Sequence, residues 1–257
     1  MAKKKEKKPA GAPMRQVPCP LCGMGGKEIR AEGDVRLCRC EDCGLAFRNP
    51  RPSLGSLNAE RDEKVKSLAE IQTRVELRPR DGKPQDVMRE YFRLSKGLPA
   101  VLNGFGRKVL EVNCGTVARL RAFEGFGWDA YGVDPSRHAI PLGSGFNALV
   151  RQGMFDAADL KENFFDLVVC YDFSVLPDPA VSAKKIARIL RPKGLAYLQV
   201  PRIPLSEEEG VPEKIEPEML FYYTNDTLRR LLAESGLKIL GESGEEDTEI
   251  TMWAKRK

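Results

Sequence analysis

Four cysteines stand at a spacing that can bind a metal ion. Cys19 and Cys22, and then Cys40 and Cys43, form two C-x-x-C-G units, and the 17 residues 23–39 separate them. This is the spacing of structural zinc sites. Two thiolates on one tight turn reach a single ion, and two such turns complete a tetrahedron with no open position. The pattern predicts a structural zinc site with these four cysteines as ligands.

Disulfides or redox-active pairs are the alternatives for the same cysteines. The first residues carry no secretory signal, which disfavours disulfides, and two matched units disfavour a redox pair. Cys38 could compete as a ligand, but the C-x-x-C-G pattern favours Cys40 with Cys43 and leaves Cys38 as a packed or free thiol. Cys114 and Cys170 fall in or at the end of expected strands, where a free cysteine packs as a small hydrophobe.

A second group of residues suits a nucleotide-type cofactor. An apolar run at 108–113 ends in Asn113, Cys114 and Gly115, and a second run ends 21 residues after Asn113 in Asp134. A glycine lets the backbone approach a ligand, and an acid in this place can bind both hydroxyls of a ribose. The G-x-G-x-x-G fingerprint and the G-K-[ST] sequence are absent, which disfavours a nicotinamide dinucleotide and a P-loop nucleotide.

Strands that alternate with helices position these residues. We expect helices at 117–124, 179–190 and 225–236. We expect strands at 108–113, 128–134, 148–151, 165–172 and 195–200. The alternation predicts βαβ units and a parallel sheet. The last two segments, 237–242 and 249–255, are expected to form a hairpin.

The chain divides into four parts. Residues 1–18 form a basic tail expected to be disordered, 19–53 the zinc ribbon, 54–104 a helical linker or lid, and 105–257 the α/β domain. Within the linker, helices are expected at about 56–77 and 85–96, with a proline- and glycine-containing break between them.

The net charge of +5 is confined to the tail. Residues 1–18 carry six basic residues and one acidic residue, so the remainder is formally neutral. Because surfaces that follow phosphates need clustered Lys and Arg, nucleic acid is disfavoured as a partner. The sequence contains no run of about 18 apolar residues, so it predicts no membrane-spanning helix. We expect the protein to stay in the cytoplasm.

In order and spacing, these segments resemble the class I S-adenosylmethionine-dependent methyltransferases. The segments that carry the resemblance are the first motif at 109–116, the end of the second strand at 131–136, the adenine-contacting turn at 155–157, and the later strand regions at 165–170, 176–179 and 189–194. Two further features resemble a bacterial subgroup with a zinc ribbon ahead of this domain. They are the two C-x-x-C units with the segment that follows them at 44–52, and the late helix at 221–236. The resemblance covers nearly everything from Cys19 to the C-terminus.

The resemblance implies a Rossmann-like fold, with a mostly parallel seven-stranded sheet that ends in an antiparallel hairpin, S-adenosylmethionine as cofactor and a small-molecule acceptor. The implied cofactor-binding residues are Glu111, Asn113, Cys114, Gly115, Asp134, Asp156 and Ala157. Tyr171 and Asp172 follow the fourth strand, where a group that faces the acceptor is expected, with loop capping as the alternative for Asp172.

The glycine-rich motif departs from its usual form. Of the three glycines in E-x-G-x-G-x-G, Gly115 is kept, whereas Asn113 and Val117 replace the others. Asn tolerates left-handed backbone angles, but Val117 adds a branched side chain where the chain is expected to pass the cofactor. Three functions follow as hypotheses: an active small-molecule methyltransferase, a methyltransferase-like binding or scaffold protein without catalysis, and an RNA methyltransferase, which the neutral remainder disfavours.

Overall fold

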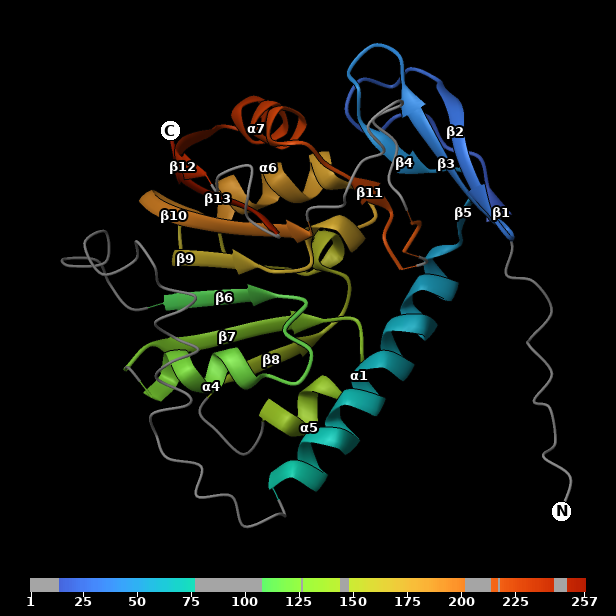
Figure 1. Cartoon of the computed structure of the whole chain (residues 1–257). Helices are drawn as coiled ribbons and strands as arrows, with labels where there is room; N and C mark the ends of the chain where they lie inside the picture. The colour runs from blue at the N-terminus through green and yellow to red at the C-terminus, as the bar shows by residue number, and fades with distance from the viewer. Residues whose placement is uncertain are drawn as a thin grey trace, which may run out of the picture.

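The computed structural model describes residues 14–76, 108–125, 127–143, 148–201, 214–216, 218–242 and 249–257. Its main feature is a seven-stranded sheet in the order β12-β13-β10-β9-β6-β7-β8 (Figure 1). The strands are β6 (Lys108–Val112), β7 (Asp129–Asp134), β8 (Leu149–Gln152), β9 (Phe165–Cys170), β10 (Leu190–Pro201), β12 (Leu237–Glu242) and β13 (Glu249–Arg256). Strands β6 to β10 pair in parallel, whereas β13 is antiparallel to β10 and β12. The expected parallel sheet with a terminal hairpin is confirmed.

One strand is longer than the sequence pattern suggested. We expected the fifth strand at 195–200, but β10 begins at Leu190, which pairs with Phe165 before the register shifts. Gly194 lies in this irregular stretch, where an added Cβ would come within 2.9 Å of the Arg191 carbonyl oxygen. The strand therefore starts directly after the preceding helix and uses a glycine to pass the irregularity.

Helices cover both faces of the sheet. The side chains of β9 alternate, so that Val168 and Cys170 join the core beneath α6 (Pro179–Ile189) and α7 (Asn225–Glu234). Leu167 and Val169 join a second core on the opposite face, which α4 (Ala118–Gly125) and α5 (Ala139–Gly143) cover. A strand buried on both faces must be apolar along its whole length, and β9 is buried at every position.

Local signals define where α6 and α7 begin. The Asp178 side chain accepts a hydrogen bond from Val181 N, and Pro179 occupies the first turn of α6. Thr224 and Thr227 form a reciprocal capping box at the start of α7. Gly236, just after α7, has a φ of 88°, a left-handed conformation in which glycine is favoured.

A small second sheet has the strand order β11-β4-β3-β2; of the four cysteines, Cys40 ends its strand β3 and the other three lie in the adjoining turns. Its strands are β2 (Gly26–Glu32), β3 (Val35–Cys40), β4 (Ala46–Arg48) and β11 (Phe221–Tyr222). The short β11 comes from the α/β domain and pairs antiparallel with β4 through Phe221 and Phe47, both of which are buried. The ribbon is thus joined to the rest of the protein by backbone pairing as well as by packing.

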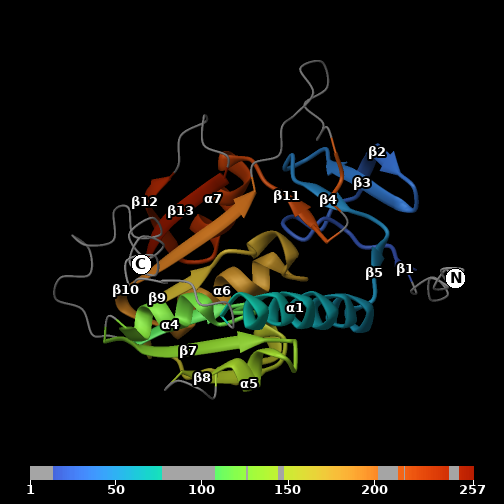
Figure 2. The same cartoon turned by 60° about the horizontal axis from the view of Figure 1, so that its bottom comes forward.

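Helix α1 (Leu54–Glu76) leaves the ribbon just after β5 (Arg51–Pro52), which pairs with β1 (Met14–Arg15). Figures 1 and 2 show α1 as a long rod that starts beside the ribbon and runs past the sheet. It corresponds to the helix expected at 56–77, whereas the helix expected at 85–96 lies outside the described residues. Within the described part of the chain, no helix has both the length and the apolar character needed to cross a membrane.

Candidate cofactor site

The turn after β6 is built around the carboxylate of Asp134. Gly115 N and Ser136 N each donate to one of its oxygens at 2.8 Å, and Asn113 N donates to the Val133 carbonyl oxygen at 2.8 Å. Asp134 is completely buried. Because β6 and β7 are parallel neighbours, their carboxyl ends bring residues 113–115 and Asp134 together. The structure therefore brings together Asn113, Gly115 and Asp134, which the sequence had linked.

The backbone of this turn is left-handed at three alternate residues. The φ angles are 57° at Asn113, 51° at Gly115 and 56° at Val117. Asn and Gly adopt this conformation readily, whereas a β-branched valine is strained in it. The Val117 side chain is fully buried in the core beneath α4, so it packs away from the turn surface. This differs from the expectation that the branched side chain of Val117 would lie where the chain passes the cofactor.

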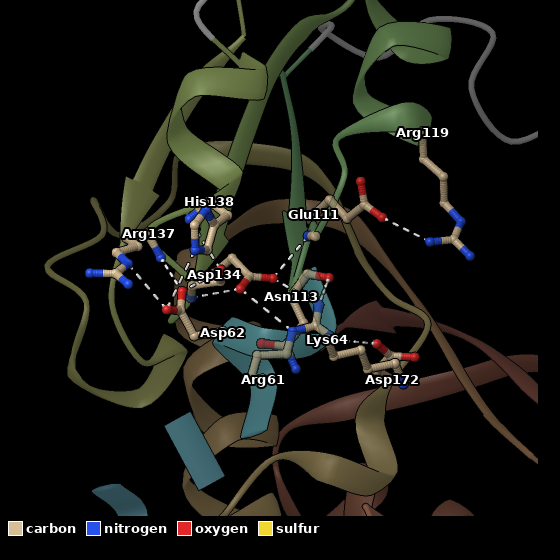
Figure 3. A network of polar contacts seen from close by, with 12 residues as sticks. Arg61, Asp62, Lys64, Glu111, Asn113, Arg119, Asp134, Arg137, His138 and Asp172 are labelled. Atoms are coloured by element: carbon tan, nitrogen blue, oxygen red, sulfur yellow. Dashed lines mark hydrogen bonds and ion pairs between the residues drawn. The ribbon is translucent and has the colours of Figure 1, made fainter. Parts of the chain in front are cut away.

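A side chain from α1 enters the site (Figure 3). The Arg61 guanidinium donates from Nη2 to Asp134 Oδ2 and to the Asn113 carbonyl oxygen, both at 2.8 Å. Its Nη1 donates to Asp172 Oδ2 at 3.0 Å. We call these contacts of Arg61 with Asn113, Asp134 and Asp172 the Arg61 bridge. Burial alone would lower the pKa of Arg61, but the two carboxylates outweigh burial and raise it, so the guanidinium stays charged.

The next residue of α1, Asp62, contacts the loop that follows β7. Asp62 Oδ1 accepts from Ser136 Oγ at 2.8 Å and from Arg137 N at 3.0 Å. Hydrogen bonding to Ser136 lowers the pKa of the Asp62 carboxyl below its usual value. Two consecutive residues of α1 therefore hold the loop that follows β7.

Glu111 and Cys114 are close to the turn but point away from its surface. Glu111 is almost fully buried, and its Oε1 lies 3.4 Å from Arg119 Nη1, on the side opposite Arg61 (Figure 3). Burial raises the Glu111 pKa to about 8. The Cys114 side chain packs against Gly132, where an added Cβ would come within 2.7 Å of the sulfur. Neither of these two expected cofactor residues therefore presents its side chain at the surface of the turn.

A cavity lies beside Asp134, under α1. Its volume is about 100 Å³. One wall is mainly apolar and comes from the loops after β7, β8 and β9, through Pro135, Met154, Val175, Leu176 and Pro177. The other side comes largely from α1, through Leu57, Asn58, Glu60, Arg61 and Lys64, with Asn113 and Glu218 completing the lining. An apolar wall next to a buried acid suits a flat heteroaromatic base joined to a sugar.

Asp156 and Ala157 lie in the 3₁₀ turn η1 (Phe155–Ala157), just after Met154. Ser182 Oγ donates to Asp156 Oδ1 at 2.5 Å, and burial raises the Asp156 pKa. The Lys185 amine donates to the carbonyl oxygens of Phe155, Asp156 and Ala158, which fixes the turn. Met154, just before the expected adenine turn, lines the cavity, whereas Asp156 and Ala157 do not, and Asp156 is bonded to Ser182 of α6.

Tyr171 and Asp172 have different environments. Tyr171 is buried, with the Arg119 guanidinium 4.0 Å from its ring centre and the Tyr197 ring 5.3 Å away, and it does not line the cavity. Asp172 has a side chain that is 42% exposed and bonded to Arg61. Neither residue lines the cavity, but Asp172 bonds Arg61, which does. Asp172 precedes the 3₁₀ turn η2 (Phe173–Val175) but makes no side-chain capping bond there.

The four expected zinc ligands are also together. The Sγ atoms of Cys19 and Cys43 are 3.5 Å apart, those of Cys22 and Cys40 are 3.3 Å apart, and all four lie within 4.8 Å of one another. Tetrahedral zinc with bonds of about 2.3 Å requires sulfur–sulfur distances of about 3.8 Å, so the cluster fits the ion. Cys38 lies outside it, with its sulfur directed to the Asn49 carbonyl oxygen at 3.7 Å. The cluster has the ligand set and geometry of a structural zinc site.

Sequence reasoning missed Arg61, Asp62 and Met154. Arg61 and Asp62 belong to a helix that the sequence assigned to a linker, inside the charged run at 60–64. A charged run is typical of a solvated helix face, so nothing in the spacing marked these two residues. Met154 could have been found, since it directly precedes the expected adenine turn.

Comparison with known families agrees with this geometry. A family model described as a methyltransferase domain matches residues 68–242, which is more than half of the chain. No protein in a curated set matches.

Solved structures show the same fold at low sequence identity. A TehB-like SAM-dependent methyltransferase from Corynebacterium glutamicum is 15% identical, with a TM-score of 0.53, over 76% of this chain and 99% of that chain. A SAM-dependent methyltransferase from Aquifex aeolicus is 16% identical, with a TM-score of 0.52, over 76% and 98%. The [4+2]-cyclase SpnF is 12% identical, with a TM-score of 0.53, over 64% and 80%. At these identities the likeness shows the fold.

Proposed function

The chain belongs to the methyltransferase-domain family, and from this premise we propose that it transfers a methyl group from S-adenosylmethionine to a small-molecule acceptor. S-adenosylmethionine is the cofactor of this fold. The observation that carries the proposal is Asp134, a buried carboxylate at the carboxyl end of β7, between the left-handed turn after β6 and the cavity. In a parallel sheet this is where a ribose is bound.

The residues around Asp134 would hold the three parts of the cofactor. The Asp134 carboxylate binds the ribose hydroxyls, and Pro135, Met154 and Leu176 form apolar walls for the adenine. The backbone of residues 113–115 faces the methionine portion, where the glycine leaves room. When bound, S-adenosylmethionine supplies a methyl group activated by a sulfonium.

Asp172 is our candidate for the group that faces the acceptor. Asp172 follows β9, and Arg61 bonds it as well as Asn113 and Asp134, so these residues lie close together. Its side chain is more exposed than that of Asp134. Its carboxylate is placed to orient the acceptor and to hold the proton that the acceptor loses. Tyr171, packed in the core behind it, supports the loop. A small acceptor fits a protein whose net charge is carried by residues 1–18.

Titration calorimetry with S-adenosylmethionine and S-adenosylhomocysteine tests the proposal. We expect Asp134→Asn to weaken binding of both by about tenfold or more, because an amide cannot accept from both hydroxyls as a carboxylate does. Asp129→Asn is the matched control, since Asp129 lies at the opposite end of β7 with an exposed side chain. If Asp129→Asn weakens binding as much as Asp134→Asn, the assignment of the site is wrong.

The Arg61 bridge favours a second candidate, a methyltransferase-like protein that does not use the cofactor. In that case Asp134 serves to hold α1 in place. Neither the wild type nor a variant without the Arg61 side chain would then bind either ligand at millimolar concentration, which would contradict the enzyme proposal.

A further inference from the structure

We propose that Arg61 closes the cofactor site in the resting protein, and that cofactor binding requires α1 to release Asp134. The inference rests on the proposed function, because it assigns to Asp134 the ribose of S-adenosylmethionine. It makes the Arg61 bridge an autoinhibitory contact built into the fold.

The hydrogen-bonding capacity of Asp134 is already used. Oδ2 accepts from Gly115 N and Arg61 Nη2, each at 2.8 Å. Oδ1 accepts from Ser136 N at 2.8 Å, with Arg61 Nε at 3.5 Å on its other side. The two backbone amides, from the turn after β6 and the loop after β7, hold the carboxylate in place. Ribose hydroxyls can therefore reach this carboxylate only by replacing the guanidinium.

The cavity beside Asp134 is too small to hold the cofactor while α1 is in place. The cavity measures about 100 Å³. Sites for small molecules and cofactors usually measure roughly 300–1,000 Å³. The guanidinium also lies against the turn, since a Cβ added at Gly115 would be 3.4 Å from Arg61 Nη2. Because α1 supplies Leu57, Arg61 and Lys64 to the lining, moving α1 would enlarge the cavity where the cofactor must enter.

The attachment of α1 is mainly polar, so its release requires little loss of apolar burial. Among residues 54–70, whose side chains the structure describes, Val65 alone is buried. Leu57, partly buried, packs against the main core, and the polar contacts include the Arg61 bridge, the Asp62 bonds to the β7 loop and the exposed pair of Lys64 with Glu218. By contrast, α7 buries Leu228, Leu231 and Leu232 in the core. Release of α1 therefore exposes little apolar surface, and its main cost is the buried ion pair of Arg61 with Asp134, whose carboxylate needs a new partner such as the ribose hydroxyls.

A closed resting state lowers the apparent affinity for cofactor. If only a fraction of molecules has Asp134 free, the apparent dissociation constant is the intrinsic constant divided by that fraction. Removal of the Arg61 side chain frees Asp134 in every molecule. We expect Arg61→Ala to bind S-adenosylhomocysteine about tenfold more tightly than the wild type, measured by calorimetry on the full chain.

Two comparisons separate release of Asp134 from a simple loss of positive charge. Lys66→Ala makes the same charge change on the same helix, but Lys66 pairs with Glu63 outside the cavity, so its affinity should match the wild type. S-adenosylmethionine carries a net positive charge and S-adenosylhomocysteine carries none. If the gain in affinity of Arg61→Ala comes from release of Asp134, both ligands should bind more tightly to a similar degree. A charge effect would strengthen the binding of S-adenosylmethionine alone, and that result would overturn the inference.

Hydrogen exchange on the wild type gives a readout that needs no variant. We expect the amides of residues 54–70 to lose protection when S-adenosylhomocysteine binds; unchanged or increased protection there would overturn the inference. Equal affinity of the wild type and Arg61→Ala would also overturn it but would leave the proposed function standing. If neither protein binds either ligand, the proposed function fails and the closure fails with it. Arg61→Lys, which keeps the charge but loses the planar fork, should bind with intermediate affinity.

Discussion

The Arg61 guanidinium and the Asp134 carboxylate lie 2.8 Å apart, although 73 positions separate them in the chain. Asp62, the neighbour of Arg61, bonds Ser136 and Arg137 beyond the same strand. Helix α1 begins at Leu54, directly after the ribbon strand β5. A continuous path of described residues thus runs from the cysteine cluster through α1 to Asp134, the acid to which we assign the ribose.

The two carboxylates of the Arg61 bridge should contribute unequally to holding α1. Asp134 is fully buried, whereas the Asp172 side chain is 42% exposed, and exposed ion pairs contribute only about 0–1 kcal/mol. We expect Asp172→Asn to tighten S-adenosylhomocysteine binding less than threefold, well below the effect of Arg61→Ala. Calorimetry on the two variants checks this. An equal gain in both would mean that Asp172 holds the helix as strongly as Asp134 does.

Glu111 should make the protein less stable as the pH rises. Burial raises its pKa from an ordinary 4.5 to about 8. An acid whose pKa is raised in the folded state stabilises that state fully below pH 4.5, and this contribution is lost as the pH rises to about 8. Glu111→Gln removes the titration and should be more stable than the wild type by roughly 2–4 kcal/mol at pH 8.5, with little difference at pH 5.

Urea unfolding at pH 5, 7 and 8.5 measures this difference. Glu63→Gln, at an exposed position of α1, is the control and should follow the wild type across the range. A wild type and a Glu111→Gln variant that differ by the same amount at every pH would contradict the assignment of the titration to Glu111.

The helices and strands of the α/β domain and the cysteine cluster could be predicted from the sequence because they depend on local patterns. A wholly apolar segment predicts a strand buried on both faces, and β9 is buried throughout. Two C-x-x-C-G units predict a cluster, and the four sulfurs are together. The position of Tyr171 was also within reach. It continues the alternation of Leu167 and Val169, which lie in the core beneath α4.

The closure of the site could not be predicted in the same way. The partners of Arg61 stand 52, 73 and 111 positions further along the chain, and charged helix residues follow no pattern that identifies a distant partner. The pairing of β11 with β4 was hidden for a related reason. β11 has two residues, too few for a periodicity to be read. Both features arise from how the ribbon and α1 pack on the sheet.

Removal of zinc should unfold the ribbon and weaken its pairing with the α/β domain. Cys19 and Cys40 are buried in the same core as Phe47 and Phe221, so the cluster and the β4–β11 pair form one packed unit. We expect the purified protein to contain one equivalent of zinc by atomic emission spectroscopy. A strong chelator or Cys43→Ser should remove the metal and lower the free energy of unfolding by several kcal/mol. Cys38→Ala is the control and should keep the metal, because its sulfur lies outside the cluster.

Lys185 should be needed for both stability and cofactor affinity. Its buried amine donates to the carbonyl oxygens of Phe155 and Asp156 at 2.6 and 3.0 Å, and also to that of Ala158. Lys185→Met keeps the length of the side chain but leaves three carbonyl groups without this donor, so we expect a loss of about 3 kcal/mol in urea unfolding. Because the turn follows Met154, which lines the cavity, S-adenosylhomocysteine binding should weaken as well. Lys184→Met, at the exposed neighbouring position, should change stability by less than about 0.5 kcal/mol. Equal losses in the two variants would mean that the amine of Lys185 is dispensable and that the turn is held by α6 packing alone.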